Sequence, residues 1–184
     1  MFEAIFFSLW FFAPAGLANL SAFASGKIRF FKKYSYPVDC FKKFRGKRIL
    51  GNHKTFRGFF FALLAGMISC YVETLFYSRF SGIRQIVPLD YSTLNPFILG
   101  GLLGFGALFG DAVKSFFKRQ KGLQPGRSWF PFDQTDYIIG GIVFSLFSFK
   151  LSIFSYLLIV IVWFFLHPLT TFIGFLLKLR HKPL

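Results

Sequence analysis

Cysteine and histidine, the side chains on which zinc binding and much covalent catalysis depend, are scarce in this sequence. There are two cysteines and three histidines among 184 residues. Cys40 and Cys70 are thirty residues apart, with no CxxC pair and no paired histidines, so neither a zinc site nor a disulfide framework is indicated. No Ser-His-Asp triad or nucleophilic cysteine context is present either, which argues against acyl transfer and covalent catalysis.

Acidic residues are also few, seven against 22 lysines and arginines, and the formal net charge is +15. Such an excess can indicate nucleic-acid binding, because clustered Lys and Arg neutralise phosphates. Here, however, 54% of the residues are hydrophobic, 31 are Phe, and the mean hydropathy is +0.55, unlike a soluble domain. Basic residues beside apolar runs are explained by membrane topology, and no nucleic-acid partner is predicted.

The N-terminus MFEAIFFSLWFF lacks the positive n-region of a signal peptide, so we interpret it as a retained membrane span. Other apolar runs also reach the roughly 20 residues that a transmembrane helix needs. The last run, from Tyr137 to Leu177, is too long for one helix, and Lys150 marks its break. We predict an all-α, polytopic membrane protein, a single domain over 1–184 with five transmembrane helices at about 2–24, 56–78, 95–117, 137–149 and 153–177.

The positions of the basic residues predict the orientation, because Lys and Arg in short loops prefer the cytoplasmic side. Of the 22 basic residues, 19 lie in 27–57, 114–127 and 178–182. This places the N-terminus outside and the C-terminus in the cytosol, as a multi-pass protein of the cell membrane. The cytosolic loops are then about 25–55 and 118–136, and the outer loop at about 79–94 is a connector.

Three of the seven acidic residues lie in the hairpin GDAVKSFFKRQKGLQPGRSWFPFDQTD, residues 110–136. Asp111 is near the cytosolic end of the third span, where an ionisable group is costly unless it is paired or binds a cation. Lys114, Ser115 and Lys118 follow at helical spacing and share its face. The simpler alternative is a contact of Asp111 with Lys114 or Ser115 that only neutralises a buried charge.

Asp133 and Asp136 open the fourth span just after Pro131 and lie on one side of its first turn. The helix dipole favours an acidic residue at this position and explains one of them without further function. Two on one face, with Asp111 ending the preceding span, could converge on one or two Mg²⁺ ions, which take oxygen ligands. These three aspartates are the predicted metal ligands and catalytic carboxylates.

Two polar stretches offer groups that bind phosphate. The loop at 122–126 has two glycines that permit close backbone approach, and it is surrounded by Lys118, Arg119, Lys121 and Arg127. The stretch GNHKTFRG at 51–58 offers hydrogen bonds and positive charge through Asn52, Thr55, Lys54 and Arg57. The alternative for this second stretch is a positive-inside cluster. Metal-assisted phosphoryl or nucleotidyl transfer at the cytosolic membrane surface is the predicted chemistry.

Glycines recur at helical spacing in the third span, at positions 100, 104, 106 and 110. Small residues let helices approach closely, so we interpret this face as a packing surface within the chain. A homodimer formed through the same face is the other interpretation.

The motifs together, GNHKTFRG at 51–58, GDAVKSFFKR at 110–119, and PG followed by DQTD at 125–136, resemble the archaeal CDP-archaeol synthase family. Those enzymes are CTP-dependent cytidylyltransferases related to CDP-diacylglycerol synthases. Pro37-Val38-Asp39 before the first motif agrees with the resemblance. Phe56 stands where Trp or Ile is expected, and the larger CDP-diacylglycerol synthase signature is only partly present, since Gln134 replaces its Arg.

The resemblance implies transfer of CMP from CTP to 2,3-bis-geranylgeranylglycerol phosphate, with Mg²⁺, in membrane phospholipid synthesis. It implies that the three aspartates hold metal and that the remaining groups contact phosphate or CTP, namely Lys114, Lys118, Arg119, Ser115, Asn52, Lys54, Thr55 and Arg57. The alternatives are the same chemistry on diacylglycerol phosphate or a polyprenyl phosphate, and a non-enzymatic membrane transporter or scaffold whose acidic residues form an ion path.

Overall fold

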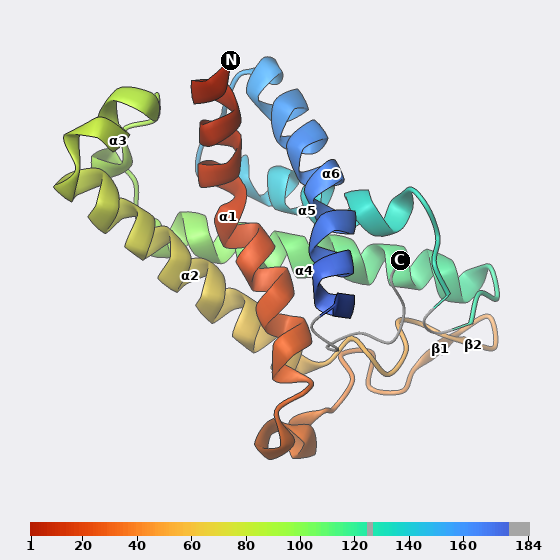
Figure 1. Ribbon diagram of the computed structural model, residues 1–184. Helices are drawn as coiled ribbons and strands as arrows, with labels where there is room; N and C mark the ends of the chain where they lie inside the picture. Colours follow the sequence, from red (N-terminus) through yellow and green to blue (C-terminus); the bar gives the residue numbers. More distant parts are fainter. Residues whose placement is uncertain (125–126, 177–184) are drawn as a thin grey trace.

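The computed structural model describes residues 1–124 and 127–176, and the regular secondary structure in this part of the chain is helical apart from one short hairpin. The predicted all-α class is thereby confirmed (Figure 1). The Pro125-Gly126 pair and the basic residues at 178–182 lie outside the described residues. The long helices are α1 (Phe2–Ser25), α2 (Phe56–Arg79), α4 (Pro96–Gln120), α5 (Phe132–Ser145) and α6 (Ile153–Leu176).

Helix α4 is at the centre of the bundle, where it contacts α1, α2 and α5. In Figure 1 it passes behind α1 and α6. In the most apolar 18-residue stretch of α4, 50% is buried inside the protein, compared with 6% of the corresponding stretch of α6. Helix α6 therefore turns most of its apolar surface outward, as a lipid-facing helix does, whereas α4 packs against protein.

Four helices, α1, α2, α4 and α6, are long and apolar enough to cross a membrane. They cover four of the five predicted spans to within a few residues. Helix α5 has 14 residues and begins five residues before the predicted fourth span, at Phe132 directly after Pro131. Its length of about 21 Å is short of a hydrocarbon core of about 30 Å. A fifth crossing, and the orientation of the chain, stay predictions.

Sequence signals explain where the central helices begin. The side chain of Asn95 accepts hydrogen bonds from the amides of Phe97 and Ile98, and Pro96 occupies the first turn of α4. Thr55 caps α2 by accepting from the amide of Gly58 at 3.2 Å. The predicted break around Lys150 is present, because α5 ends at Ser145 and α6 begins at Ile153.

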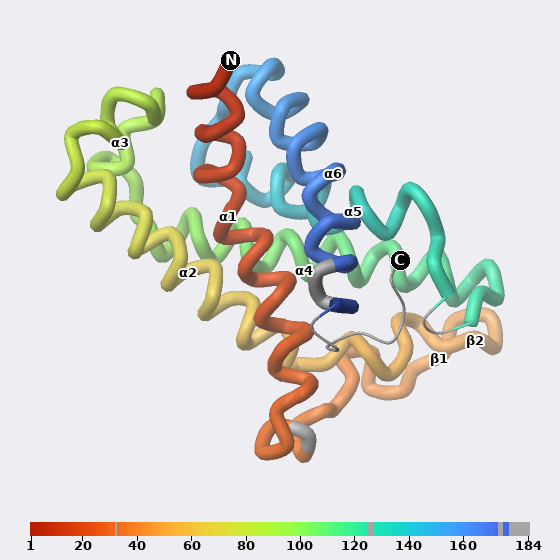
Figure 2. The backbone as a smooth tube through the Cα atoms, in the orientation of Figure 1, coloured from red at the N-terminus to blue at the C-terminus, as the bar shows by residue number. Residues whose placement is uncertain are grey.

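The loop between α1 and α2 has structure of its own. It contains the 3₁₀ helix η1 (Arg29–Tyr34) and the antiparallel strands β1 (Lys43–Phe44) and β2 (Lys47–Arg48). The strands are joined through two residues with positive φ, Arg45 and Gly46, as a tight hairpin requires. Figure 2 shows this segment in orange beneath the bundle, with the hairpin near the end of α4.

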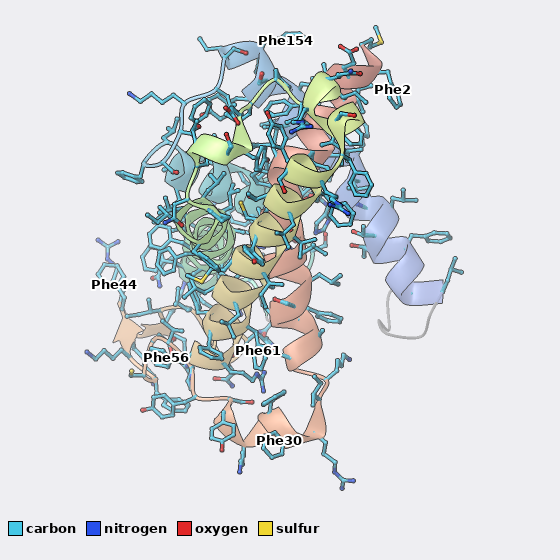
Figure 3. The ribbon with its side chains drawn as sticks, turned by 90° about the vertical axis from the view of Figure 1, so that its left-hand side faces the viewer. Phe2, Phe30, Phe44, Phe56, Phe61 and Phe154 are labelled. Atoms are coloured by element: carbon cyan, nitrogen blue, oxygen red, sulfur yellow. The ribbon has the colours of Figure 1, made fainter. Side chains whose placement is uncertain are left out.

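The outer connector is also partly ordered, with α3 (Ser81–Ile86) and η2 (Tyr91–Thr93). Figure 3 separates the two ends of the molecule: Phe2 and Phe154 lie at one end, and Phe30 lies at the other. Phe44, Phe56 and Phe61 lie toward the end of Phe30. The loop between α1 and α2 therefore covers the end of the bundle opposite the N-terminus.

Candidate active site

Three aspartates converge on the ammonium group of Lys114. Its Nζ lies 3.0 Å from Asp111 Oδ1, 2.9 Å from Asp133 Oδ1 and 2.5 Å from Asp136 Oδ2. Asp111 and Lys114 belong to α4, Asp133 belongs to the first turn of α5, and Asp136 follows it three residues later. The sequence prediction that these carboxylates meet is therefore correct in space, and the group that joins them is a lysine.

Two further lysines complete this charge cluster. Lys118 Nζ contacts both carboxylate oxygens of Asp133, at 2.8 and 3.0 Å, and Lys54 pairs with Asp111 from the loop before α2. Three carboxylates thus face three ammonium groups, and none of the six side chains is more than 20% exposed. Removing one partner of such a pair leaves an uncompensated charge away from water, which costs about 3–5 kcal/mol.

Glycines set the distance between α4 and α5 at this point. A Cβ on Gly110 would lie 2.1 Å from the backbone oxygen of Asp136, and one on Gly106 would lie 2.5 Å from that of Gly140. Backbone atoms cannot move aside as a flexible side chain does, so only glycine permits this approach. The glycine face is thereby occupied by neighbouring helices of the same chain, as the packing interpretation predicted. Gly100 and Gly104 lie in the same way against Gly66 and Ala62 of α2.

Asp39 organises the loop that carries Lys54, although it was not among the predicted site residues. Its carboxylate accepts two hydrogen bonds from Arg48, at 2.7 and 3.2 Å. It also accepts from the backbone amides of Phe41, Leu50 and Gly51. Burial acts to raise the pKa of Asp39, but the hydrogen bonds from Arg48 and the three amides outweigh it and lower the pKa to about 2.

The two ends of this loop are fastened together beside Lys54. The amide of Val38 donates to the carbonyl of Lys54 at 2.8 Å, and the amide of Phe56 donates to the carbonyl of Tyr36 at 3.1 Å. Asp39 and this short pairing hold the loop in one conformation, so Lys54 is presented to Asp111 by a fixed backbone. The Pro-Val-Asp sequence at 37–39 was the signal available for Asp39.

The other residues predicted for the CTP pocket have different partners. Thr55 is buried as the cap of α2, and Asn52 accepts from Arg48 at 2.9 Å. Arg57 donates to the carbonyl of Phe31 and to Ser35. Of the predicted residues in 51–58, Lys54 is the one that the described structure joins to the aspartates.

Two predicted residues of α4 lie beside the charge cluster without entering it. The hydroxyl of Ser115 donates to the backbone carbonyl of Asp111 at 2.8 Å, which leaves the carboxylate of Asp111 to the lysines. Arg119 packs beside Gly51, with its Cδ 3.8 Å from the position of a Cβ there. The Nε of Arg119 is buried with no hydrogen-bond partner in the described structure, so this guanidinium has donor capacity to spare.

An apolar groove of about 600 Å³ runs along α4, on a face of the helix that does not carry the charge cluster. Its walls come from the loop before α2, from the first turns of α2 and from the outer face of α4. Leu50 and Ala112 belong to its lining and are the sequence neighbours of Gly51 and Asp111. The groove and the cluster therefore share two elements, α4 and the loop before α2.

The donor set suits a hard divalent cation, because three carboxylates supply only oxygen atoms. Within residues 1–124 and 127–176, however, no three His, Cys, Asp or Glu side chains are arranged as a metal site. The Lys114 ammonium occupies the point where the aspartates converge. Asp111, Asp133 and Asp136 could hold a metal once that amine turns to another partner, such as a phosphate oxygen.

These features define an α-helical, multi-pass membrane protein with an enclosed cluster of carboxylates and lysines and an apolar groove along the same central helix. A family model described as CarS-like, CDP-archaeol synthase, matches residues 1–184. The chain belongs to the CDP-archaeol synthase family, and it is therefore an enzyme of the CTP-dependent cytidylyltransferase class. A non-enzymatic transporter or scaffold is no longer a competing interpretation.

Similarity to individual proteins extends over most of the chain. It is 35% identical to the CDP-archaeol synthase of Methanosarcina barkeri, over 92% of this chain and 98% of that protein. It is 36% identical to the one of Methanopyrus kandleri, over 95% and 91%, and 30% identical to the one of Methanocaldococcus jannaschii, over 97% of each. A solved structure of an intramembrane enzyme for archaeal membrane lipids biosynthesis has the same fold, with a TM-score of 0.69 at 24% identity, covering 88% of this chain and 90% of that one.

Proposed function

We propose that the protein transfers CMP from CTP to an isoprenoid glycerol ether lipid phosphate, in a Mg²⁺-dependent reaction that releases pyrophosphate. The observation that carries the proposal is the cluster of three aspartates and three lysines on α4, α5 and the loop before α2, two of which also form an apolar groove. Family membership supports the use of CTP and of an archaeol lipid phosphate. The metal and the residue roles are inferred from the charges and contacts described above.

In the proposed step, an oxygen of the lipid phosphate attacks the α-phosphorus of CTP. A new P–O bond forms there, and the bond from the α-phosphorus to the oxygen bridging to the β-phosphate breaks. That oxygen leaves with pyrophosphate, and the product is the CDP-activated lipid. A phosphate monoester is largely ionised near neutral pH, since its second pKa is about 6, so the attacking oxygen needs no histidine base.

The lysines would neutralise the phosphate oxygens, which is the main requirement of phosphoryl transfer. Lys114 and Lys118 are held by carboxylates in the structure, and these ion pairs keep their ammonium groups oriented before the substrate arrives. Lys54 approaches from the loop before α2. Arg119, whose Nε has no hydrogen-bond partner in the described structure, directly follows Lys118 on α4. Phosphate oxygens of CTP would then replace the carboxylates as partners of the lysines, with Asn52 bordering the pocket.

Asp111, Asp133 and Asp136 would hold Mg²⁺ as their lysine partners turn toward phosphate. When bound, the metal would neutralise negative charge on the attacked phosphate and on the departing pyrophosphate. Repulsion between three closely spaced carboxylates is relieved by any cation, so the amine and the metal are alternative ways to satisfy the same oxygens. No histidine or cysteine ligand is required by this arrangement.

The lipid would enter from the bilayer with its chains in the apolar groove and its phosphate near Leu50 and Ala112. CTP would come from the cytosol, in agreement with the orientation predicted from the loop charges. This arrangement explains why an enzyme for an amphiphile and a soluble nucleotide has its charged site at the end of a helix bundle. The two substrates can meet only at the membrane boundary.

The proposal is tested by titrating CTP against several lipid phosphates with purified protein and measuring pyrophosphate. We expect release with 2,3-bis-geranylgeranylglycerol phosphate and Mg²⁺, and none when EDTA removes the metal. Diacylglycerol phosphate and a polyprenyl phosphate are the alternative acceptors. Faster turnover with either of them would replace the lipid assignment while keeping the chemistry, and no pyrophosphate with any acceptor would contradict the proposed function.

A further inference from the structure

The 3₁₀ helix η1 displays aromatic and basic side chains on its outer face. Phe30 is 66% exposed and Tyr34 is 53% exposed. The Lys33 ammonium lies over both rings, 5.1 Å from the centre of Phe30 and 4.9 Å from that of Tyr34. Exposing aromatic rings to water is unfavourable, and here both residues stay more than half exposed beside the Lys33 ammonium.

The inner face of the same helix is fixed against α2. The rings of Phe31 and Phe61 are 4.7 Å apart between centres. Arg57 donates to the carbonyl of Phe31 at 2.9 Å and to the hydroxyl of Ser35 at 2.7 Å. The outer side chains are thus presented by an anchored element, and the position of Arg57 is explained by this anchoring.

The location of η1 relative to the membrane follows from α1. That helix has 24 residues, about 36 Å at the usual rise per residue, and it exceeds a hydrocarbon core of about 30 Å. Residue 29 comes four positions after the last residue of α1, so an α1 that spans the membrane brings η1 to the boundary between lipid and water. Figure 3 shows Phe30 at the extreme end of the molecule, opposite Phe2.

Charge and chemistry at this boundary favour one partner. Residues 27–36 contain four basic side chains and no acidic one. Aromatic rings settle at the level of lipid headgroups, and basic residues beside a span attract anionic lipids. A nucleotide would instead require rings that enclose its base, whereas Phe30 and Tyr34 lie on an exposed outer face.

We propose that the outer face of η1, formed by Phe30, Lys33 and Tyr34 with Lys27 and Arg29, is a docking surface for anionic headgroups of the surrounding bilayer. The rings insert at headgroup level and the cations pair with lipid phosphates. This surface is separate from the aspartate and lysine cluster. It does not depend on the proposed reaction, because any anionic bilayer lipid satisfies it.

The test uses full-length protein in nanodiscs of phosphatidylcholine alone, or of phosphatidylcholine with one third phosphatidylglycerol. Amide hydrogen exchange over residues 28–34 is measured in both. Each basic residue near an anionic surface contributes about five-fold in binding, so we expect at least about five-fold slower exchange in the anionic discs. Raising the salt to about 1 M, where the Debye length is about 3 Å, should remove the difference.

A triple variant that removes three positive charges, Lys27→Gln, Arg29→Gln and Lys33→Gln, should abolish the difference in exchange rate between the two kinds of disc. The matched control removes the same charge from the hairpin region of the same loop, through Lys42→Gln, Lys43→Gln and Arg45→Gln, and should keep it. Equal loss in the two triple variants, or equal exchange of the wild type in both discs, would overturn the proposal. Protection by inorganic phosphate in phosphatidylcholine discs would also overturn it, by indicating a free-anion site. The salt titration on wild type stands even if a variant fails to fold.

Discussion

Lys114 joins two interpretations that the sequence left as alternatives. A lysine contact that neutralises Asp111 and a metal site formed by three aspartates had been separate hypotheses. The structure places the same lysine against Asp111, Asp133 and Asp136. Its ammonium keeps three mutually repelling carboxylates together, so the neutralising contact is also what would arrange them for a divalent cation.

The first prediction concerns the aspartates themselves. Asp111→Asn and Asp133→Asn, made separately, should each lower Mg²⁺-dependent formation of the CDP-lipid by about 100-fold or more, the usual size of losing one transition-state charge contact. Asp90→Asn is the matched control, because Asp90 is an exposed residue of the outer connector and should leave activity unchanged. Melting curves in detergent identify unfolding. Full activity in both site variants would remove the metal assignment.

The second prediction concerns Asp39 and pH. Its pKa in the folded protein is about 2, below the usual 3.8, so the ionised form is the one that stabilises the loop. That stabilisation is complete above about pH 4 and is lost as the pH falls through about 2. Pepsin cleavage within residues 39–51 should therefore be slow at pH 4 and rise steeply toward pH 2.

Asp39→Asn supplies the comparison for this pH dependence. The amide keeps the size of the side chain and removes the charge that Arg48 contacts. We expect cleavage of the variant loop to be fast already at pH 4. We also expect a higher KM for CTP, because Lys54 is no longer held in place. A variant that stays protected at pH 4, with an unchanged KM for CTP, would show that Asp39 does not position the loop.

At the scale of elements, the third prediction concerns the packing of α4 against α5. Gly110→Ala would place a Cβ 2.1 Å from a backbone oxygen of α5, and overpacking of this kind costs about 1–3 kcal/mol. We expect a lower melting temperature in detergent and loss of activity, because Asp136 moves away from Lys114. Gly82→Ala is the control, since a Cβ there meets nothing within 4 Å. Equal behaviour of the two variants would contradict the packing argument.

The elements could largely be read from the sequence, because long apolar runs and capping residues are local signals. Asn95-Pro96 and Pro131 mark helix starts. The limits of α5 were less visible, since its apolar run continues past Ser145 while the helix ends there. The loop between α1 and α2 was least predictable, because its fold depends on one buried carboxylate, Asp39, whose partners are up to twelve residues away.

At the scale of the molecule, the candidate site joins three segments that are distant in sequence. Helical spacing was enough to predict that Asp111 and Lys114 share a face and that Asp133 and Asp136 share another. It could not show that Lys54 reaches Asp111 across 57 positions, nor that Arg57 turns to η1 instead. Such contacts depend on how the loop crosses the bundle end, which is a property of tertiary packing.

The final prediction concerns the orientation of the whole molecule in the membrane, which the two cysteines allow to be tested by chemical labelling. Cys40 is exposed in the loop between α1 and α2, and Cys70 is buried in α2. If this loop faces the cytosol, a membrane-impermeant maleimide should leave Cys40 unlabelled in intact cells and label it after permeabilisation. The reciprocal variant combines Cys40→Ser with Ser81→Cys, which lies in the exposed outer connector, and should be labelled in intact cells. Labelling of Cys40 from outside would reverse the orientation and place the charge cluster away from cytosolic CTP.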